Sequence, residues 1–267
     1  MQPGREDIQK TWKSMLEIAL KAAKAGGEVL SHYFETSIEK RVKDDLSFVT
    51  KADVEAEAKI REVIASKFPE HTFVGEESGV DKKESSYQWY VDPLDGTINF
   101  ANGLPIFAVS IGLAKGDELV ACVIHNPVTN SLFYAEKGKG AFWNEEKISV
   151  SNQDATKAMI TIGRGKKEED KAYVNRIFTG ALKHIKTVRY LGSAALEMAY
   201  LARGGTEGYV NLGTQKWDYA AGALLVQEAG GTITDLEGNP WSMEQNYFVA
   251  SNGIAHNDLL KVVNTLS

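Results

Sequence analysis

Apolar residues recur at helical spacing near the start of the chain. Over residues 8–34 they return every three or four positions, which predicts a long amphipathic helix. Gly26 and Gly27 fall inside this pattern and are expected to weaken the helix locally. A second helical pattern covers residues 52–68 and ends before Pro69, which cannot continue a helix.

The pattern then changes to short apolar runs separated by turn residues. TFV at 72–74 and WYV at 89–91 are typical of strands, and the second runs directly into DPLDG. Between residues 106 and 134, the runs FAVSIGLA, LVACVIH and SLFYAE alternate with turn signals at 115–117 and 126–127. These features predict an antiparallel meander.

Strand and helix patterns alternate after residue 151. Strands are predicted at 158–163, 208–212, 232–235 and 247–251, and helices at 170–184, 193–202, 218–229 and 257–266. Helices therefore come first, an antiparallel sheet next and strand–helix units last. The order predicts a layered α+β fold whose first sheet is antiparallel and whose second sheet is mixed. The change near residue 150 divides the chain into subdomains 1–150 and 151–267, expected to form one compact unit.

Composition narrows the class of protein. The chain has 267 residues, of which 43% are hydrophobic and 25% charged, as in ordinary globular proteins. Its formal charge of −6 disfavours a general binder of nucleic acid or of anionic membranes. An anionic substrate stays compatible with this charge if a bound cation reverses the local sign. Without a secretory-type apolar segment or an apolar run approaching about 20 residues, we expect a soluble, cytoplasmic protein with no membrane partner.

Several common catalytic motifs are absent. Cys122 is the single cysteine and is flanked by apolar residues, which indicates a buried, inert thiol and excludes an intrachain disulfide. The five histidines share no metal-ligand spacing and are interpreted as structural, so a Ser-His-Asp hydrolase is disfavoured. No Walker loop or G-x-G-x-x-G sequence is present, and Leu94 at the third position of DPLDG breaks the EF-hand pattern.

The densest polar motif is WYVDPLDGTINF. Asp92 and Asp95 bracket a Pro-Leu pair at the end of a predicted strand, and Gly96 permits a tight turn. The two carboxylates and the Leu94 carbonyl are hard oxygen donors, which suit Mg²⁺ or Mn²⁺. The N–H groups of Gly96 and Thr97 would open a helical turn and can receive phosphate oxygens. The alternative is an ordinary Asx-rich turn that caps a helix.

Three further segments carry acidic candidates. Glu76 and Glu77 lie in GEESG after a predicted strand, where the alternative is a solvated turn. Asp218 in KWDYAAG and Asp53 in VTKADVEAE each lie at the start of a predicted helix, where the alternative is a helix cap.

The order and spacing of four segments resemble those of the inositol monophosphatase family, whose members are Mg²⁺-dependent, Li⁺-sensitive phosphatases. The segments are GEES, DPLDGTINF, RYLGSAA, and WDYAAG followed by EAGG. The resemblance covers most of the chain, from about residue 17 onward. It implies an αβαβα sandwich and a homodimer. The implied activity is the hydrolysis of a small phosphate monoester, inositol 1-phosphate or a related sugar or polyol phosphate, by metal-activated water in an in-line displacement.

The resemblance also implies which residues hold two or three Mg²⁺ ions, with Mn²⁺ as a substitute. Glu76, Asp92 and the Leu94 carbonyl would bind the first ion. Asp92, Asp95 and Asp218 would bind the second, and a third, weaker ion would use Glu76 and waters.

Other roles are implied in the same way. Asp53 and Thr97 would orient or activate the attacking water together with Glu76, and Glu77 would support the metal ligands. Substrate contacts would come from the positions Gly96, Thr97, Gly192, Ser193, Ala194 and Asn211.

The substrate stays open. Asn211 stands seven positions before Asp218, where many inositol-preferring members have an acidic residue. The alternatives within the superfamily are histidinol phosphate, fructose 1,6-bisphosphate and 3′-phosphoadenosine 5′-phosphate. Arg164, Arg189 and Lys216 are candidates for contacting a second anionic group, with solvated surface as the alternative. An alternative of another class is a non-catalytic regulator that keeps the fold.

Overall fold

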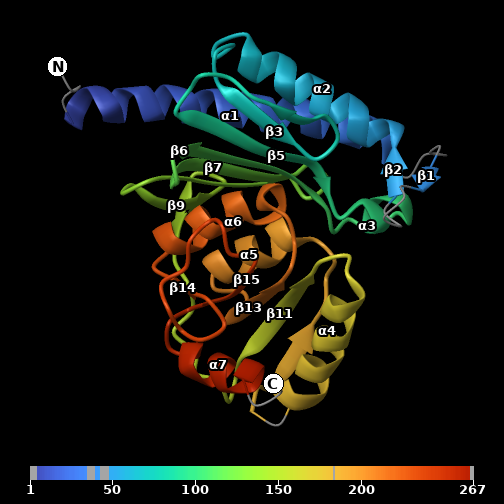
Figure 1. Cartoon of the computed structure of the whole chain (residues 1–267), viewed down its shortest axis with the longest axis vertical. Helices are drawn as coiled ribbons and strands as arrows, with labels where there is room; N and C mark the ends of the chain where they lie inside the picture. Colours follow the sequence, from blue (N-terminus) through green and yellow to red (C-terminus); the bar gives the residue numbers. More distant parts are fainter. Residues whose placement is uncertain (1–4, 35–39, 43–47, 183, 265–267) are drawn as a thin grey trace.

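Layers of helices and sheets alternate through the molecule (Figure 1). The computed structural model describes residues 5–34, 40–42, 48–182 and 184–264. Two N-terminal helices cover one face of an eight-stranded sheet, and two central helices lie between this sheet and a five-stranded sheet. Two more helices cover the outer face of the second sheet. The αβαβα sandwich implied by the sequence is confirmed.

The two N-terminal helices are α1 (Arg5–Tyr33) and α2 (Lys51–Ala65). They pack against each other and against the first sheet. Gly26 and Gly27 do not interrupt α1. A Cβ on Gly26 would lie 2.8 Å from the Ile60 side chain, and one on Gly27 would lie 2.8 Å from Nδ1 of His125. The glycines therefore let α1 approach α2 and the sheet more closely than a residue with a side chain could.

The first sheet has the strand order β10-β9-β8-β7-β6-β5-β3-β4. Its strands are β3 (Thr72–Gly75), β4 (Gly79–Asp81), β5 (Tyr87–Asp95), β6 (Ala108–Lys115), β7 (Glu118–Asn126), β8 (Ser131–Glu136), β9 (Gly140–Trp143) and β10 (Glu146–Ile148). The predicted meander is confirmed by β6, β7 and β8. The expected antiparallel sheet needs one correction, because β3 and β5 run parallel. Strand β4 folds back along the far side of β3, and the chain then returns in the direction of β3.

Strand β5 extends beyond the predicted WYV run, through Pro93 to Asp95. Its register against β6 shifts between Asp92 and Asp95, where Pro93 has no N–H to give to a regular ladder. Gly96 then ends the strand with a φ angle of 99°, and a Cβ there would lie 2.7 Å from the Ile106 carbonyl oxygen. The short helix α3 (Thr97–Ala101) follows this corner. Strands β1 (Lys40–Val42) and β2 (Phe48–Thr50) form a separate pair before α2.

The second sheet has the strand order β12-β11-β13-β15-β14 and is mixed, as predicted. Its strands are β11 (Met159–Arg164), β12 (Thr187–Arg189), β13 (Gly208–Leu212), β14 (Thr232–Thr234) and β15 (Tyr247–Ser251). Helices α4 (Glu168–Ala181) and α7 (His256–Asn264) cover its outer face.

Helices α5 (Ala194–Ala202) and α6 (Lys216–Glu228) lie between the two sheets. Small residues allow close packing here, since a Cβ on Gly222 would lie 2.6 Å from the Met198 side chain. A Cβ on Gly112 of β6 would lie 2.9 Å from that of Ala220. The close approach brings the N-terminal end of α6, which carries Asp218, toward β5.

The buried polar residues outside the site agree with the sequence interpretation. Cys122 is buried, and burial raises the pKa of its thiol. Burial lowers the pKa values of His71, His125 and His256, which indicates neutral structural histidines. Within the part of the chain that the structure describes, no helix combines the length and hydropathy needed to cross a bilayer.

Candidate active site

A cavity of about 440 Å³ opens at the corner between β5 and α3. Its walls come from sequence segments far apart: the turn after β3, the β5–α3 corner, the end of β11, the segment before α5 and the first turn of α6. The volume is in the range of small-molecule sites. The cavity can therefore hold a small metabolite.

Three carboxylates meet in this cavity. Glu76, Asp92 and Asp218 each offer one oxygen, and these oxygens lie within 4.8 Å of one another. The parallel pairing of β3 with β5 explains part of this geometry, because Gly75 lies opposite Val91 and the Glu76 N–H donates to the Val91 carbonyl at 3.1 Å. Asp218 lies in the first turn of α6, where its Oδ2 accepts the Gln215 N–H at 2.6 Å. Gln215 is the N-cap of α6, so Asp218 is not the N-cap residue that the alternative expected. Asp218 stabilises the helix start from the third helical position, and the same residue also lines the cavity.

The cluster is strongly anionic. Burial raises the pKa of Asp92 well above its usual value, and the charges of Glu76, Asp95, Asp218 and Asp53 raise it further. The pKa of Asp218 is also raised well above its usual value, first by burial and then by Glu76 and Asp95. Without a cation, these groups compete for protons to relieve their repulsion.

A divalent cation fits this set of donors. Carboxylate oxygens are the ligands that hard cations such as Mg²⁺ and Mn²⁺ prefer. A bound cation would replace the protons that the raised pKa values indicate and would convert repulsion into ligation. Among the described residues, this is the one group of three His, Cys, Asp or Glu side chains found close enough to share an ion.

Asp95 faces the start of α5 at the edge of the cavity. Its Oδ2 accepts the Ser193 hydroxyl at 2.6 Å and the Ala195 N–H at 2.8 Å, and its Oδ1 accepts the Ala194 N–H at 3.2 Å. Burial raises the pKa of Asp95 to about 6, although these three hydrogen bonds favour the charged form. Asp95 therefore connects the β5 corner with the segment that the family resemblance assigns to substrate binding.

The water-orienting candidates lie close to the same corner. The Thr97 hydroxyl donates to the Leu94 carbonyl at 3.0 Å, and the Leu94 N–H donates to Oδ1 of Asp92 at 2.9 Å. Asp53 on α2 is 1% exposed, and its charge contributes to the raised pKa of Asp92.

Comparisons with known proteins identify the family of the chain. The sequence profile of the inositol monophosphatase family matches residues 11–267. The chain belongs to the inositol monophosphatase family. It is 37% identical over 257 residues to a fructose-1,6-bisphosphatase/inositol-1-monophosphatase of Aquifex aeolicus, covering 94% of this chain and 95% of that protein. It is 40% identical over 243 residues to the Nus factor SuhB of Vibrio cholerae, covering 89% and 91%. The solved inositol monophosphatase of Anabaena has a TM-score of 0.85 and 33% identity, covering 96% of this chain and 97% of that one.

The inositol monophosphatase resemblance assigned Gly192, Ser193 and Ala194 to the substrate pocket, and all three line the cavity with Gly96. Ser193 also caps α5 by accepting the Leu196 N–H at 3.4 Å.

Two other residues that the resemblance assigned to the site do not line the cavity. Asn211 is fully buried and does not line the cavity. Its Oδ1 accepts the hydroxyls of Tyr209 at 2.6 Å and Thr214 at 2.8 Å, and its Nδ2 donates to the Asn246 carbonyl at 2.7 Å. The Glu77 side chain also lies outside the set of residues that line the cavity.

Of the three cationic residues proposed to contact a second anionic group, one lines the cavity and two do not. Arg164 lines the cavity. Arg189 instead bonds to Thr187 at 2.6 Å, and Lys216 pairs with Glu244 at 2.5 Å, both away from the cavity lining.

The sequence analysis missed several residues that line or brace this cavity. Lys166 and Lys171 line the cavity beside Arg164, and Lys166 lies 4.0 Å from Oε1 of Glu76. Nδ2 of Asn99 donates at 2.8 Å to both the Ile106 and the Leu191 carbonyls, which joins α3 to the segment before α5.

Glu57 was missed as well, although a signal for it exists. It lies four residues after Asp53, on the same face of the predicted helix.

Proposed function

We propose that the chain hydrolyses a small phosphate monoester, inositol 1-phosphate or a related sugar or polyol phosphate, in a reaction that depends on Mg²⁺. The observation that carries the proposal is the meeting of Glu76, Asp92 and Asp218 within 4.8 Å in a cavity of metabolite size. Membership of the inositol monophosphatase family supports the reaction class.

In this proposal, Glu76, Asp92 and the Leu94 carbonyl hold one Mg²⁺, and Asp92, Asp95 and Asp218 hold a second. Glu76 also serves a third, weaker ion, and Mn²⁺ can substitute for Mg²⁺. Bound Mg²⁺ supplies positive charge to the phosphoryl oxygens and lowers the pKa of bound water. General acid–base assistance alone contributes only about 10²–10⁴ in rate, far less than the hydrolysis of a phosphate monoester requires.

The chain's own groups bind and orient the reactants. The N–H groups of Gly96 and Thr97, which both line the cavity, are proposed to receive phosphate oxygens. Asp53 and the Thr97 hydroxyl are proposed to orient the attacking water, with Glu77 supporting the ligands from outside the cavity. The segment Gly192, Ser193 and Ala194 forms the wall against which the alcohol part of the substrate would rest.

The test is phosphate release from a panel of inositol 1-phosphate, histidinol phosphate, fructose 1,6-bisphosphate and 3′-phosphoadenosine 5′-phosphate. We expect release with Mg²⁺, loss of release with EDTA, inhibition by Li⁺, and no release by Asp92→Asn. Release that is unchanged by EDTA, or no release from any ester, would reject the proposal.

The cationic wall favours a second substrate class, esters with an additional anionic group. Arg164, Lys166 and Lys171 line the cavity that also holds the acidic cluster. The Aquifex aeolicus relative is named for fructose-1,6-bisphosphatase as well as inositol-1-monophosphatase activity. Arg164→Gln is then expected to raise KM for fructose 1,6-bisphosphate more than for inositol 1-phosphate. Arg189→Gln, which removes a cation outside the cavity, is the matched control.

A non-catalytic role is the alternative of another class, because several relatives carry the name Nus factor SuhB. Clustered carboxylates that are buried or partly buried destabilise a fold unless a ligand neutralises them, which favours catalysis. The wild-type result of the phosphate-release panel separates the two alternatives.

A further inference from the structure

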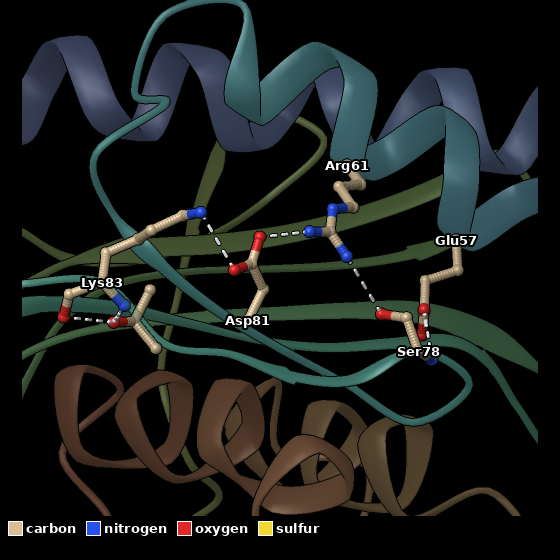
Figure 2. Close-up of polar contacts among 6 residues, drawn as sticks. Glu57, Arg61, Ser78, Asp81 and Lys83 are labelled. Atoms are coloured by element: carbon tan, nitrogen blue, oxygen red, sulfur yellow. Dashed lines mark hydrogen bonds and ion pairs between the residues drawn. The ribbon is translucent and has the colours of Figure 1, made fainter.

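The turn that carries Glu76 is held from α2, as Figure 2 shows. Glu57 on α2 is 3% exposed, and its two carboxylate oxygens bind two successive N–H groups of the turn. The Glu77 N–H donates to Oε2 at 2.8 Å, and the Ser78 N–H donates to Oε1 at 2.7 Å. One side chain therefore satisfies two backbone donors that the strand ladder leaves over between β3 and β4.

The contact between Glu57 and the turn is tight. A Cβ on Gly75 would lie only 2.5 Å from Oε2 of Glu57. The carboxylate thus rests directly on the backbone of the residue that precedes Glu76. A glycine is required at this position because any side chain would displace the carboxylate.

Arg61 holds the same hairpin one helical turn further along α2. Its guanidinium donates to the Ser78 hydroxyl at 3.5 Å and pairs with Asp81 of β4 (Figure 2). Lys83 lies 3.0 Å from the other oxygen of Asp81. Glu57 and Arg61 therefore form two adjacent attachments between α2 and the β3–β4 hairpin.

The backbone of Glu76 is fixed on its opposite side by β5, where its N–H donates to the Val91 carbonyl at 3.1 Å. Val91 is the neighbour of Asp92, so this hydrogen bond sets one ligand relative to the other. The attachment to Glu57 prevents the turn from pivoting about the β5 contact. Asp53 lies one helical turn before Glu57, so the same helix that carries the water-orienting candidate also anchors the turn.

We propose that Glu57 is a positioning residue, whose carboxylate fixes the 76–78 turn so that Glu76 is presented to the metal together with Asp92 and Asp218. The inference rests on the proposed function, in which Glu76 is a metal ligand. Glu57 is not among the residues that line the cavity. Its effect is on how tightly the metal is held.

The test is direct binding of Mn²⁺, measured by electron paramagnetic resonance of the free ion, for the wild type, Glu57→Gln and Glu62→Gln. A glutamine has one acceptor oxygen, so its NH₂ group would face one of the two turn N–H groups. We expect Glu57→Gln to raise the Kd for Mn²⁺ about tenfold, as for other partners of metal ligands. The kcat at saturating Mg²⁺ should stay within about threefold of the wild-type value, since the filled site has the same ligands.

Glu62→Gln is the matched control. Glu62 lies on the same helix, is exposed and pairs only with Lys59 among the contacts described, so the same change of charge should leave the Kd unchanged. If Glu57→Gln fails to fold, Arg61→Gln carries the test, because Arg61 is partly exposed and holds the same hairpin. It should raise the Kd for Mn²⁺ about threefold.

Each outcome decides the question. If Glu57→Gln binds Mn²⁺ with the wild-type Kd, Glu57 has no positioning role. If its melting temperature falls while the Kd for Mn²⁺ is unchanged, the role of Glu57 is structural only, which also overturns the proposal. A loss of kcat at saturating metal with unchanged Kd also overturns it. Failure of the wild type to bind Mn²⁺ at all would instead reject the proposed function.

Discussion

Replacing Asp218 with asparagine should separate the stability of the metal-free fold from its ability to bind metal. The amide oxygen of asparagine can keep the hydrogen bond from the Gln215 N–H, now 2.6 Å long, so the first turn of α6 keeps its cap. The substitution removes one charge from the cluster with Glu76 and Asp92. We therefore expect Asp218→Asn to stabilise the protein in EDTA.

The size of the effect follows from the distances. At 4.8 Å and an effective dielectric constant of about 20, two ionised carboxylates repel by about 3.5 kcal/mol. The raised pKa values of Asp92 and Asp218 show that protonation relieves part of this repulsion, so the expected net gain is about 1–2 kcal/mol. For a domain of this size, such a gain corresponds to a rise in Tm of about 2–6 °C.

Magnesium should stabilise the wild type more than the Asp218→Asn variant. A ligand at 100 times its Kd stabilises the wild-type fold by about 2.7 kcal/mol, and Asp218→Asn should lose most of this gain. The assay is thermal unfolding of both proteins in EDTA and in Mg²⁺, followed by phosphate release. Asp258→Asn, a partly exposed aspartate in the first turn of α7 paired with Lys261, is the control for a change of charge at a helix start.

The reasoning would be wrong if Asp218→Asn melted at or below the wild-type temperature in EDTA and gained as much as the wild type from Mg²⁺. Retained phosphate release by the same purified variant would remove Asp218 from the site.

Two further predictions follow from the pKa values and the packing. The rise in Tm caused by Mg²⁺ should shrink as the pH falls from about 8 to about 5.5, because metal binding needs deprotonated carboxylates. Folding raises the pKa of Asp95 to about 6, so the folded, metal-free protein binds a proton that the unfolded chain releases. This proton binding stabilises the metal-free fold at low pH, and the stabilisation is lost as the pH rises through about 6. Scanning fluorimetry in EDTA and Mg²⁺ checks this, and an equal Mg²⁺ effect at both pH values would contradict it. Gly163→Ala should lower the free energy of unfolding by about 1–3 kcal/mol, because its Cβ would overlap the Tyr209 hydroxyl. Adding Tyr209→Phe should recover part of the loss in denaturant unfolding, and an unchanged midpoint for Gly163→Ala would refute the clash.

The parts of the site that the sequence predicts are those with a local pattern. Asp92 and Asp95 lie in one short motif after a strand, and Asp218 starts a helix of small residues. Each of these aspartates can be placed on a predicted strand end or helix start from its neighbours in the sequence alone. The structure brings Asp92 and Asp218 together with Glu76 because the start of α6 packs against β5 in the layered fold.

The parts that the sequence does not predict depend on contacts between distant segments. Ser193 and Asp95 are 98 residues apart, and nothing near either residue marks their hydrogen bond. Lys166 and Lys171 are ordinary charged residues until the fold places them on the cavity wall.

Glycines were misjudged for a related reason. Gly26 and Gly27 reduce helix propensity in isolation, but tertiary packing of α1 against Ile60 and His125 outweighs that preference. The parallel pairing of β3 with β5 also depends on where β4 packs, which a local pattern does not indicate.

The carboxylate cluster combines residues that are far apart in the sequence, since Glu76 and Asp92 precede residue 100 and Asp218 follows residue 200. During synthesis, an N-terminal portion emerging from the ribosome can build its sheet while two acids face each other with no third partner. The proposed metal site can therefore form only after α6 has been synthesised and has packed against the first sheet. A product that ends before α6 would keep Glu76 and Asp92 but lack Asp218, and we expect it to bind a divalent cation more weakly than the 267-residue chain.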